Sequence, residues 1–280
     1  MTPDLDALTS ATLKHLRERW WDDEFTEFLA ETLRPRAGNR ILDVGCGTGI
    51  GEVAIGRLQV SQLRLYGVDI DPEKAIASRR ETLSHNMRAR FAAGDACRLP
   101  FTDGAFDSTY CVAVLQHIGD VDAAAREFAR VTQPGGRIVA VEPDNGGRYF
   151  YSSTPWGRRA AQVAAQFFTA LASDRGERSD ASIGPKLPGI FSRAGIEPID
   201  VRIFPVTQTQ LGAPAPQLWQ ERRMRVEKAL QRATTDDVKV LGKEYLVLLN
   251  SYEAEAAEAG TSFIEIQNTM LFATVGQRSE

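Results

Sequence analysis

The stretch Asp43-Val44-Gly45-Cys46-Gly47-Thr48-Gly49-Ile50-Gly51 follows a short apolar segment, residues 40–44, and opens a predicted helix. Glycines at such a junction permit a tight turn and let a ligand approach the backbone closely. The dinucleotide fingerprint G-x-G-x-x-G/A fails from either start, because Ile50 and Glu52 occupy the place of its last small residue. The phosphate-loop pattern fails too, since no Lys-Ser/Thr pair follows. The loop indicates a nucleotide-like ligand of another kind.

Two acids refine this interpretation. Asp43 ends the first predicted strand, and Asp69 ends the second, 20 residues beyond Gly49. A carboxylate at Asp69 suits ribose hydroxyls. A carboxylate at Asp43 would repel a pyrophosphate and would suit an ammonium group. The two acids favour a ribose-containing ligand that carries positive charge and no phosphate.

Strands and helices alternate along the chain. Apolar segments separated by helices of 10–15 residues predict βαβ units and a parallel sheet in one doubly wound domain. We predict one domain over residues 1–280, with a cofactor-binding core at 38–150 and helical insertions at 151–182 and 213–260, a kind of insertion that commonly forms lids. The predicted strands are 40–44, 64–69, 90–93, 106–112, 137–142, 197–204 and 263–275; the predicted helices include 5–34, 72–83, 120–131, 155–171 and 185–194, and Pro134-Gly135-Gly136 reads as a turn.

Composition narrows the functional class. The 280 residues are 43% hydrophobic and 25% charged, which is ordinary globular usage. The net charge of −4 disfavours a nucleic-acid partner. Three cysteines without metal-ligand spacing, and no apolar run of about 18 residues, indicate a cytoplasmic protein without a membrane span. The oligomeric state is not readable from the sequence.

Five segments in order resemble the class I S-adenosylmethionine-dependent methyltransferases, most closely over residues 38–145. The subgroup is similar to the ubiquinone/menaquinone-biosynthesis C-methyltransferases and related small-molecule enzymes. This resemblance implies a Rossmann-like, mostly parallel seven-stranded sheet with an antiparallel last strand, and S-adenosylmethionine as cofactor. The segments are ILDVGCGTG (41–49), GVDIDPE (67–73), GDACRLPF (94–101), FDSTYCVAVLQHI (106–118) and RVTQPGGRIVAVEP (130–143).

The resemblance implies roles at the methionine end of the cofactor. Gly45, Cys46 and Gly47 would pass under the methionine moiety. Asp43 would hold its ammonium group, and Val112 would offer a backbone contact. The structural alternative for Asp43 is a cap on the helix that follows.

At the nucleoside end, the resemblance implies that Asp69 binds the ribose hydroxyls and that Ile70 packs on the adenine. Asp95 would accept from the exocyclic amine, and the Ala96 backbone N–H would donate to the ring. The structural alternatives are a turn at Asp71 that begins with Asp69, and a solvated loop for Asp95.

His117, just past the fourth strand, is the candidate general base if the acceptor must lose a proton. The alternative is a histidine packed at the start of the next helix. Glu142-Pro143-Asp144-Asn145 resembles part of the metal site of catechol-type O-methyltransferases. Residues 110–113 lack the carboxylate that such a site also needs, so we predict a turn and no metal.

Aromatic residues could line an acceptor pocket: Tyr149, Tyr151 and Trp156, together with Trp21. Core packing is the alternative for each. The arginines at 222, 223 and 225 read as a solvated face, and the tyrosines at 245 and 252 as core.

The leading hypothesis is methyl transfer to carbon or oxygen of a small molecule. Neither an Asn/Asp-Pro-Pro-Tyr motif nor a Pro-Cys nucleophile follows the fourth strand, which disfavours methylation of nucleic-acid bases. A nicotinamide-dependent reductase is less favoured, because no Tyr-x-x-x-Lys occurs. A catalytically silent protein that binds S-adenosylmethionine stays open as the alternative.

Overall fold

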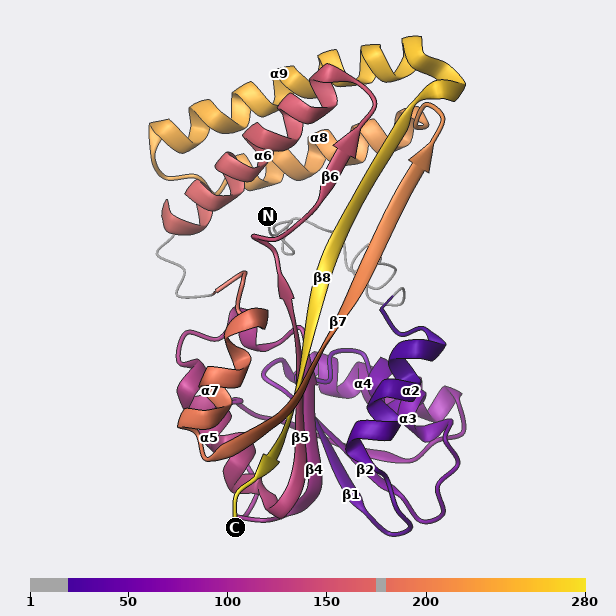
Figure 1. The fold of residues 1–280 in the computed structure, drawn as a ribbon, viewed down its shortest axis with the longest axis vertical. Coiled ribbons are helices and arrows are strands. Elements are labelled where there is room, and N and C mark those ends of the chain that lie inside the picture. The colour runs from indigo at the N-terminus through magenta and orange to yellow at the C-terminus, as the bar shows by residue number, and fades with distance from the viewer. Residues whose placement is uncertain (1–19, 175–179) are drawn as a thin grey trace. The chain divides into compact units, whose positions relative to one another are not determined.

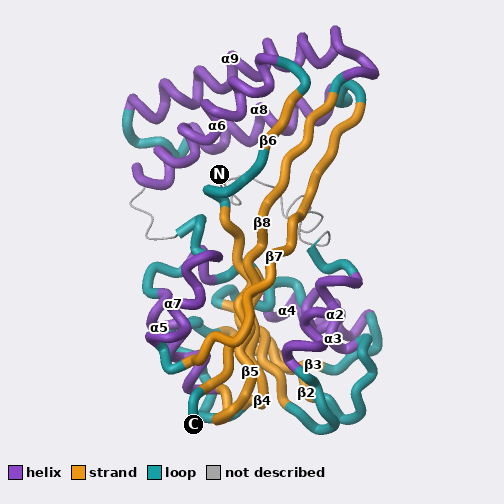
Figure 2. Tube along the Cα trace, in the orientation of Figure 1, coloured by secondary structure: helices purple, strands orange, loops and turns teal. Residues whose placement is uncertain are grey.

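The computed structural model describes residues 20–174 and 180–280 (Figures 1 and 2). The chain divides into two compact units. We call the first the sheet unit; its described residues are 20–144, 180–204 and 271–280. We call the second the helical unit; its described residues are 145–174 and 205–270.

The sheet unit is built on five parallel strands in the order β3-β2-β1-β4-β5. The strand order reverses between β1 and β4, and this is the place where doubly wound folds bind ligands at the carboxyl ends of their strands. β8 follows β5 in the sheet and also pairs with β7, and Figure 1 shows β7 and β8 running in opposite directions. The predicted fold class is confirmed. The strands are β1 (Arg40–Val44), β2 (Arg64–Asp69), β3 (Ala89–Ala93), β4 (Phe106–Val112), β5 (Thr132–Asp144), β7 (Ile196–Leu211) and β8 (Ile264–Arg278).

Helices cover both faces of this sheet (Figure 1). Alternate strand residues point to opposite faces, and Leu42 and Val44 pack with Phe128 and Phe191 in a buried core against one pair of helices. The intervening Asp43 faces the other set of helices. The helices on the face of Leu42 and Val44 are α5 (Val121–Val131) and α7 (Leu187–Arg193). The helices on the face of Asp43 are α2 (Asp23–Leu33), α3 (Ile50–Gly56) and α4 (Pro72–Ser84).

Aspartates begin three of these helices. The side chains of Asp22, Asp71 and Asp120 each accept from a backbone N–H in the first turn, which satisfies a donor that the helix itself leaves unpaired. The predicted start of α4 at Asp71 is confirmed. The N-terminal helix predicted at 5–34 begins at Asp23 in the described chain, because Asp22 caps it there; residues 5–19 of that prediction lie outside the described residues.

Three strands are longer than predicted. β5 begins at Thr132 and includes Pro134-Gly135-Gly136, where its register against β4 shifts, so the predicted turn is an irregularity within the strand. β7 extends to Leu211 past Pro205, and an edge strand tolerates a proline because one side needs no ladder hydrogen bond. β8 extends to Arg278.

The helical unit includes residues 151–174 and 213–260 of the two predicted insertions, which are mostly helical, whereas residues 180–182 belong to the sheet unit. The buried core of the helical unit includes Phe167, Trp219, Leu249 and Tyr252. An eighth strand, which the sequence did not predict, is β6 (Phe150–Ser152), antiparallel to β8. The helices are α6 (Pro155–Asp174), α8 (Pro216–Leu230) and α9 (Asp236–Ala259). Residues 175–179 of the predicted insertion 151–182 lie outside the described residues.

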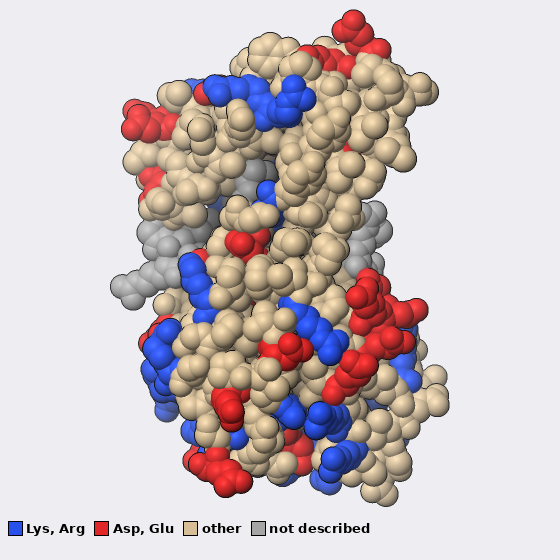
Figure 3. Space-filling model, viewed as in Figure 1, with Lys and Arg blue, Asp and Glu red and all other residues tan. Residues whose placement is uncertain are grey.

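The face drawn in Figure 3 carries acidic and basic side chains interspersed. Within residues 20–174 and 180–280, no helix combines the length and hydrophobicity needed to cross a bilayer.

Candidate functional site

The glycine loop between β1 and α3 turns sharply over the end of β2. The N–H groups of Gly45 and Cys46 both donate to the carbonyl oxygen of Val68, at 2.6 and 3.1 Å. Gly45 has φ +75°, and a Cβ there would lie 2.3 Å from Cγ2 of Val114. Both the left-handed backbone and the close approach of Val114 require glycine at this position.

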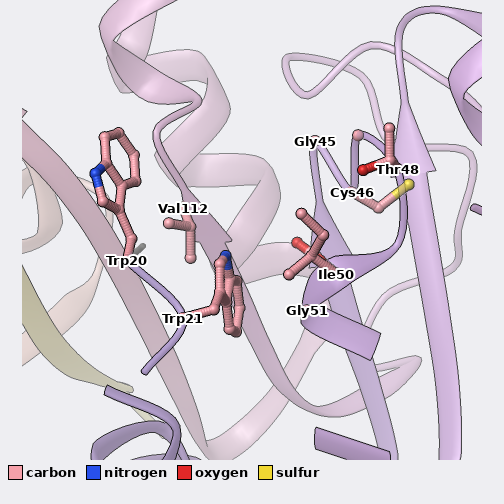
Figure 4. A pocket seen from close by; sticks show the side chains of 10 residues that line it. Trp20, Trp21, Gly45, Cys46, Thr48, Ile50, Gly51 and Val112 are labelled. Atoms are coloured by element: carbon pink, nitrogen blue, oxygen red, sulfur yellow. The ribbon is translucent and has the colours of Figure 1, made fainter. Parts of the chain in front are cut away.

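A pocket lies against this loop and encloses about 430 Å³ of space that is partly open to solvent. In Figure 4 the indole of Trp21 stands beside Gly51 and Ile50, where α3 begins. The structure thus brings together several residues predicted separately. The lining residues are Trp20, Trp21, Asp43, Gly45, Cys46, Gly47, Thr48, Ile50, Gly51 and Val112.

Asp43 belongs to a row of residues across the sheet. In the strand register, it pairs with Gly67 of β2 on one side and with Tyr110 of β4 on the other. The Tyr110 hydroxyl donates to Oδ2 of Asp43 at 3.0 Å, in a buried hydrogen bond. Asp43 therefore does not cap α3. Its carboxyl is oriented by a tyrosine that sequence reasoning assigned only to the strand.

Glu52 is the second acid of this region, and sequence reasoning missed it. Its side chain is only 1% exposed, and neither carboxyl oxygen has a hydrogen-bond partner. The carboxyl occupies the space left by Gly67, since a Cβ at Gly67 would lie 2.4 Å from Oε1 of Glu52. An acid in the first turn of a helix is ordinary in a sequence, so only the absence of a side chain on β2 explains its burial beside Asp43.

Burial and the repulsion of nearby carboxylates hold Asp43 and Glu52 in their neutral forms. Burial, with a smaller contribution from Asp69, raises the pKa of Asp43 to about 8, although the Tyr110 hydrogen bond opposes the rise. Burial and the charge of Asp43 raise the pKa of Glu52 well above its ordinary value. Burial also raises the pKa of the Cys46 thiol. The pair Asp43 and Glu52 therefore holds a proton that a bound cation would displace.

Asp69 braces the glycine loop from the end of β2. Its Oδ2 accepts from the Gly47 N–H at 2.9 Å, and its Oδ1 accepts from the Asp71 N–H at 3.0 Å. Asp69 thus both begins the turn into α4 and supports the glycine loop. Ile70, the next residue, is 74% exposed.

Asp95 and Ala96 follow β3, the neighbour of β2. The Asp95 side chain accepts from the Cys97 N–H at 2.9 Å and is exposed, as in a solvated turn. Ala96 is buried. Because Asp69 pairs with Ala93 in the sheet register, the ends of β2 and β3 lie side by side at the same edge.

Glu142 organises the loop that follows β4. Its side chain is fully buried, and Oε1 accepts from the N–H groups of Val114 and Leu115, both at 2.7 Å. The Gln116 N–H donates to Oε2 at 3.3 Å. His117 ends this loop in a short 3-10 helix, Leu115–His117, and is exposed. Glu142 thereby positions both Val114, which packs on Gly45, and His117.

The four aromatic residues predicted for an acceptor pocket fall in two groups. Trp21 lines the pocket of the sheet unit and packs edge-to-face on Phe25, with ring centroids 5.1 Å apart. Tyr149, Tyr151 and Trp156 belong to the helical unit and are exposed there. Among the described residues, no three His, Cys, Asp or Glu side chains gather as a metal site would require.

Known proteins resemble the part of the chain that holds this site. A sequence model described as a methyltransferase domain matches residues 42–140. Residues 42–140 form a methyltransferase domain. The domain includes the glycine loop, Asp43, Asp69 and the end of β4.

Two relatives are similar to the methyltransferase domain and the residues around it. The 27-O-demethylrifamycin SV methyltransferase of Amycolatopsis mediterranei is 33% identical over 147 residues, 48% of this chain and 52% of that protein. A demethylmenaquinone methyltransferase of Mycobacterium marinum is 33% identical over 135 residues, 48% of this chain and 53% of that protein. The chain spans about half the length of these curated relatives.

The fold beyond the methyltransferase domain is also known from solved structures. The [4+2]-cyclase SpnF has a TM-score of 0.52 and 20% identity, over 92% of this chain and 80% of that chain. This similarity concerns the fold alone.

Proposed function

We propose that the chain transfers a methyl group from S-adenosylmethionine to a small-molecule acceptor. The observation that carries this proposal is the acidic lining of the pocket beside the glycine loop, where the Asp43 carboxyl can give up its proton to a bound cation. Its lining includes the carboxyl of Asp43 and no Lys or Arg among the described residues. A pocket of this kind suits a cationic ligand and disfavours a diphosphate.

The residues beside the loop fit the methionine end of this cofactor. Gly45, Cys46 and Gly47 line the pocket and would pass under the methionine moiety. Asp43 would hold the ammonium group, and Val112 would offer a backbone contact. The buried carboxyl of Glu52, which has no hydrogen-bond partner, fits the same cationic group. Bound here, the cofactor would supply a methyl group on a sulfonium. The acceptor would attack the methyl carbon in line, and the sulfur would leave as a thioether. The chain's own task is to position the partners and to exclude water.

The ends of β2 and β3 would hold the nucleoside. We assign the ribose hydroxyls to Asp69 and the adenine to Ile70, Asp95 and the Ala96 N–H. The exposed side chain of Ile70 is an apolar surface on which a base can stack, and the Asp95 carboxylate has acceptor capacity left beyond its bond to Cys97.

The acceptor would be a small molecule, methylated on carbon or oxygen. Two relatives in this sequence range are named for methylation of a demethylrifamycin and of a demethylmenaquinone, which supports this class. We assign Trp21 to the acceptor side of the pocket and keep Tyr149, Tyr151 and Trp156 as proposed acceptor contacts.

The proposal extends to the whole chain. The family match ends at residue 140, so a single methyltransferase domain over residues 1–280 stays a prediction. The lid role of the insertions and the absence of a nucleic-acid partner are also predictions. We also propose a cytoplasmic location, which the three free cysteines support.

Methyl transfer is tested with radiolabelled S-adenosylmethionine and a metabolite extract. We expect label to pass to a small molecule. Cofactor binding without any transfer would instead favour a catalytically silent binding protein. Failure to bind the cofactor at all would contradict both functions.

The first variant to test is Asp69→Ala. We expect it to weaken binding of S-adenosylmethionine by about 1–3 kcal/mol, because charge-assisted hydrogen bonds to the ribose are lost. Calorimetry on protein verified as folded measures this. Glu73→Ala, which removes an exposed acid in the first turn of α4, is the control and should bind normally. Unchanged affinity in Asp69→Ala would refute the ribose role.

The second variant is His117→Ala. If His117 is the general base, we expect turnover to fall by about 100-fold while the affinity for the cofactor stays within twofold. Turnover is measured at saturating acceptor. Equal turnover in the variant and the native protein would remove His117 from the chemistry and leave positioning as the main contribution of the protein.

A further inference from the structure

Two of the arginines on α8 lie on its buried side, so the predicted solvated face is wrong for them. Arg222 forms a bidentate ion pair with the buried Glu265, at 2.9 and 2.7 Å. Its guanidinium also lies over the ring of Trp219, 4.7 Å from the centroid. The charge of Arg222 is therefore compensated within the helical unit.

Arg225, one helical turn further along α8, has no such partner. Its Nε is buried without a hydrogen bond, and so is the Nε of Arg148, which precedes β6. No ion pair joins Arg148 or Arg225 to an acid anywhere in the described part of the chain. Each guanidinium is partly buried with an unpartnered Nε, and the charge of Arg225 acts on Arg148, so two positive groups without a counter-ion lie near each other.

The strand register brings Arg148 toward the helices. Ser152 pairs with Glu265 and Phe150 pairs with Gln267 across β6 and β8. Side chains alternate between the two faces of a strand, so Arg148 continues the face of Phe150 and Ser152. Phe150 packs against the core of the helical unit, whereas the intervening Tyr149 is exposed. Arg148 therefore extends on the side of Glu265 and α8.

The electrostatics agree with this placement. Burial, followed by the charge of Arg225, lowers the pKa of Arg148 to about 10. Burial also lowers the pKa of Arg225, with Arg222 contributing in the same direction; the phenol of Tyr245 on α9 and the acid Glu221 oppose it. Glu221 is exposed, so its field is screened by water. The cluster has an excess of positive charge within the helical unit.

We propose that Arg148 and Arg225 bind the acid group of a small molecule, a carboxylate or a phosphate, with Tyr245 beside it. Guanidinium groups bind such oxyanions in pairs of parallel hydrogen bonds, and a bound anion supplies the negative charge that the cluster lacks. The inference goes beyond the proposed methyl transfer and does not depend on it, because every residue in it belongs to the helical unit.

The test is thermal unfolding of the full chain, without cofactor, in rising inorganic phosphate or acetate at constant ionic strength. We expect a saturable rise in Tm. In Arg148→Gln and in Arg225→Gln the half-saturating concentration should increase about tenfold or more. Lys228→Gln removes an exposed charge from the same helix and should respond as the native protein does. Arg225→Lys keeps the positive charge but loses the planar guanidinium, and it should also bind the anion more weakly than the native protein does.

The readouts separate a binding site from a structural role. Each glutamine variant should melt, without anion, no lower than the native protein, since it loses an unfavourable like-charge contact. A larger response to phosphate assigns a phosphorylated ligand, and an equal or larger response to acetate assigns a carboxylate. The proposal is overturned if neither anion gives a saturable response, or if the arginine variants respond as Lys228→Gln does.

Discussion

Replacing Glu142 by alanine is expected to lower the free energy of unfolding by about 3 kcal/mol or more, because buried N–H donors would lose their acceptor. The carboxylate accepts from three consecutive backbone N–H groups, those of Val114, Leu115 and Gln116. Ala113, just before them, has φ +58°, a left-handed conformation that costs free energy in a residue with a Cβ. Hydrogen bonds from Glu142 thus hold a loop that is unfavourable in isolation. Urea denaturation measures the loss.

The same variant should also weaken the pocket. Val114 packs against Gly45, so displacement of the loop that Glu142 holds would remove a packing contact from the glycine turn. We expect weaker cofactor binding in Glu142→Ala and an intermediate loss of stability in Glu142→Gln, which keeps one acceptor oxygen. Glu73→Ala, at an exposed position on α4, is the control and should stay within about 0.5 kcal/mol of the native protein. A loss below about 1 kcal/mol in Glu142→Ala would show that the loop is held by other contacts.

The second large effect is a dependence of cofactor affinity on pH, which the neutral acids beside the loop predict. A cation bound at Asp43 requires the ionised carboxylate, and burial raises the pKa of that group to about 8. Below this pKa, binding must release a proton, so the affinity should rise with pH by up to about tenfold per pH unit. S-adenosylhomocysteine, which keeps the ammonium and the ribose, is a suitable unreactive ligand for calorimetry between pH 5.5 and 7.5.

Two variants locate this proton. Asp43→Asn removes the titrating group, so its affinity should be low and nearly independent of pH. Glu52→Gln replaces a neutral acid by a neutral amide and should leave the dependence near that of the native protein, because burial and Asp69 raise the pKa of Asp43. Calorimetry in two buffers of different ionisation enthalpy counts the protons released. A flat profile in the native protein would contradict the ionised Asp43 as the cation's partner.

The stability of the ligand-free protein should show the opposite trend. A carboxyl whose pKa is higher in the folded than in the unfolded state binds more protons when folded, so stability falls as pH rises. For Asp43 the window runs from its ordinary pKa of 3.8 to about 8. In Asp43→Asn this contribution to the pH dependence should disappear.

Local patterns in the sequence were sufficient for the sheet unit. Alternating strands and helices, an aspartate before a proline at Asp71, and glycines after β1 are signals between near neighbours. Asp43 and Asp69 were recognisable for the same reason, because each ends a strand beside the loop. The boundaries of β5, β7 and β8 could not be recognised in the sequence. Pairing with a neighbouring strand extends a strand through prolines and glycines that would otherwise end it.

The electrostatic character of individual side chains came from tertiary contacts. Glu52 in a first turn and Arg225 in a run of arginines have ordinary surface patterns in the sequence. Glu52 is buried because Gly67, on another strand, leaves room for its carboxyl. Arg225 is half-buried, with its Nε out of reach of water, because it lies on the side of α8 that also carries the buried Val226 and Ala229. Gly67 beside Glu52 and Tyr245 beside Arg225 are both distant in the chain from the side chains that they affect.

The amino-acid order alone determined the fold class, the glycine turn and the acids at the ends of β1 and β2, because hydrophobic periodicity and turn chemistry act over a few residues. Only the tertiary structure decided which ionisable groups are buried, which acids stay protonated and which cations lack a counter-ion. Those properties depend on desolvation and on groups brought together from distant segments, and neither is written in the local pattern.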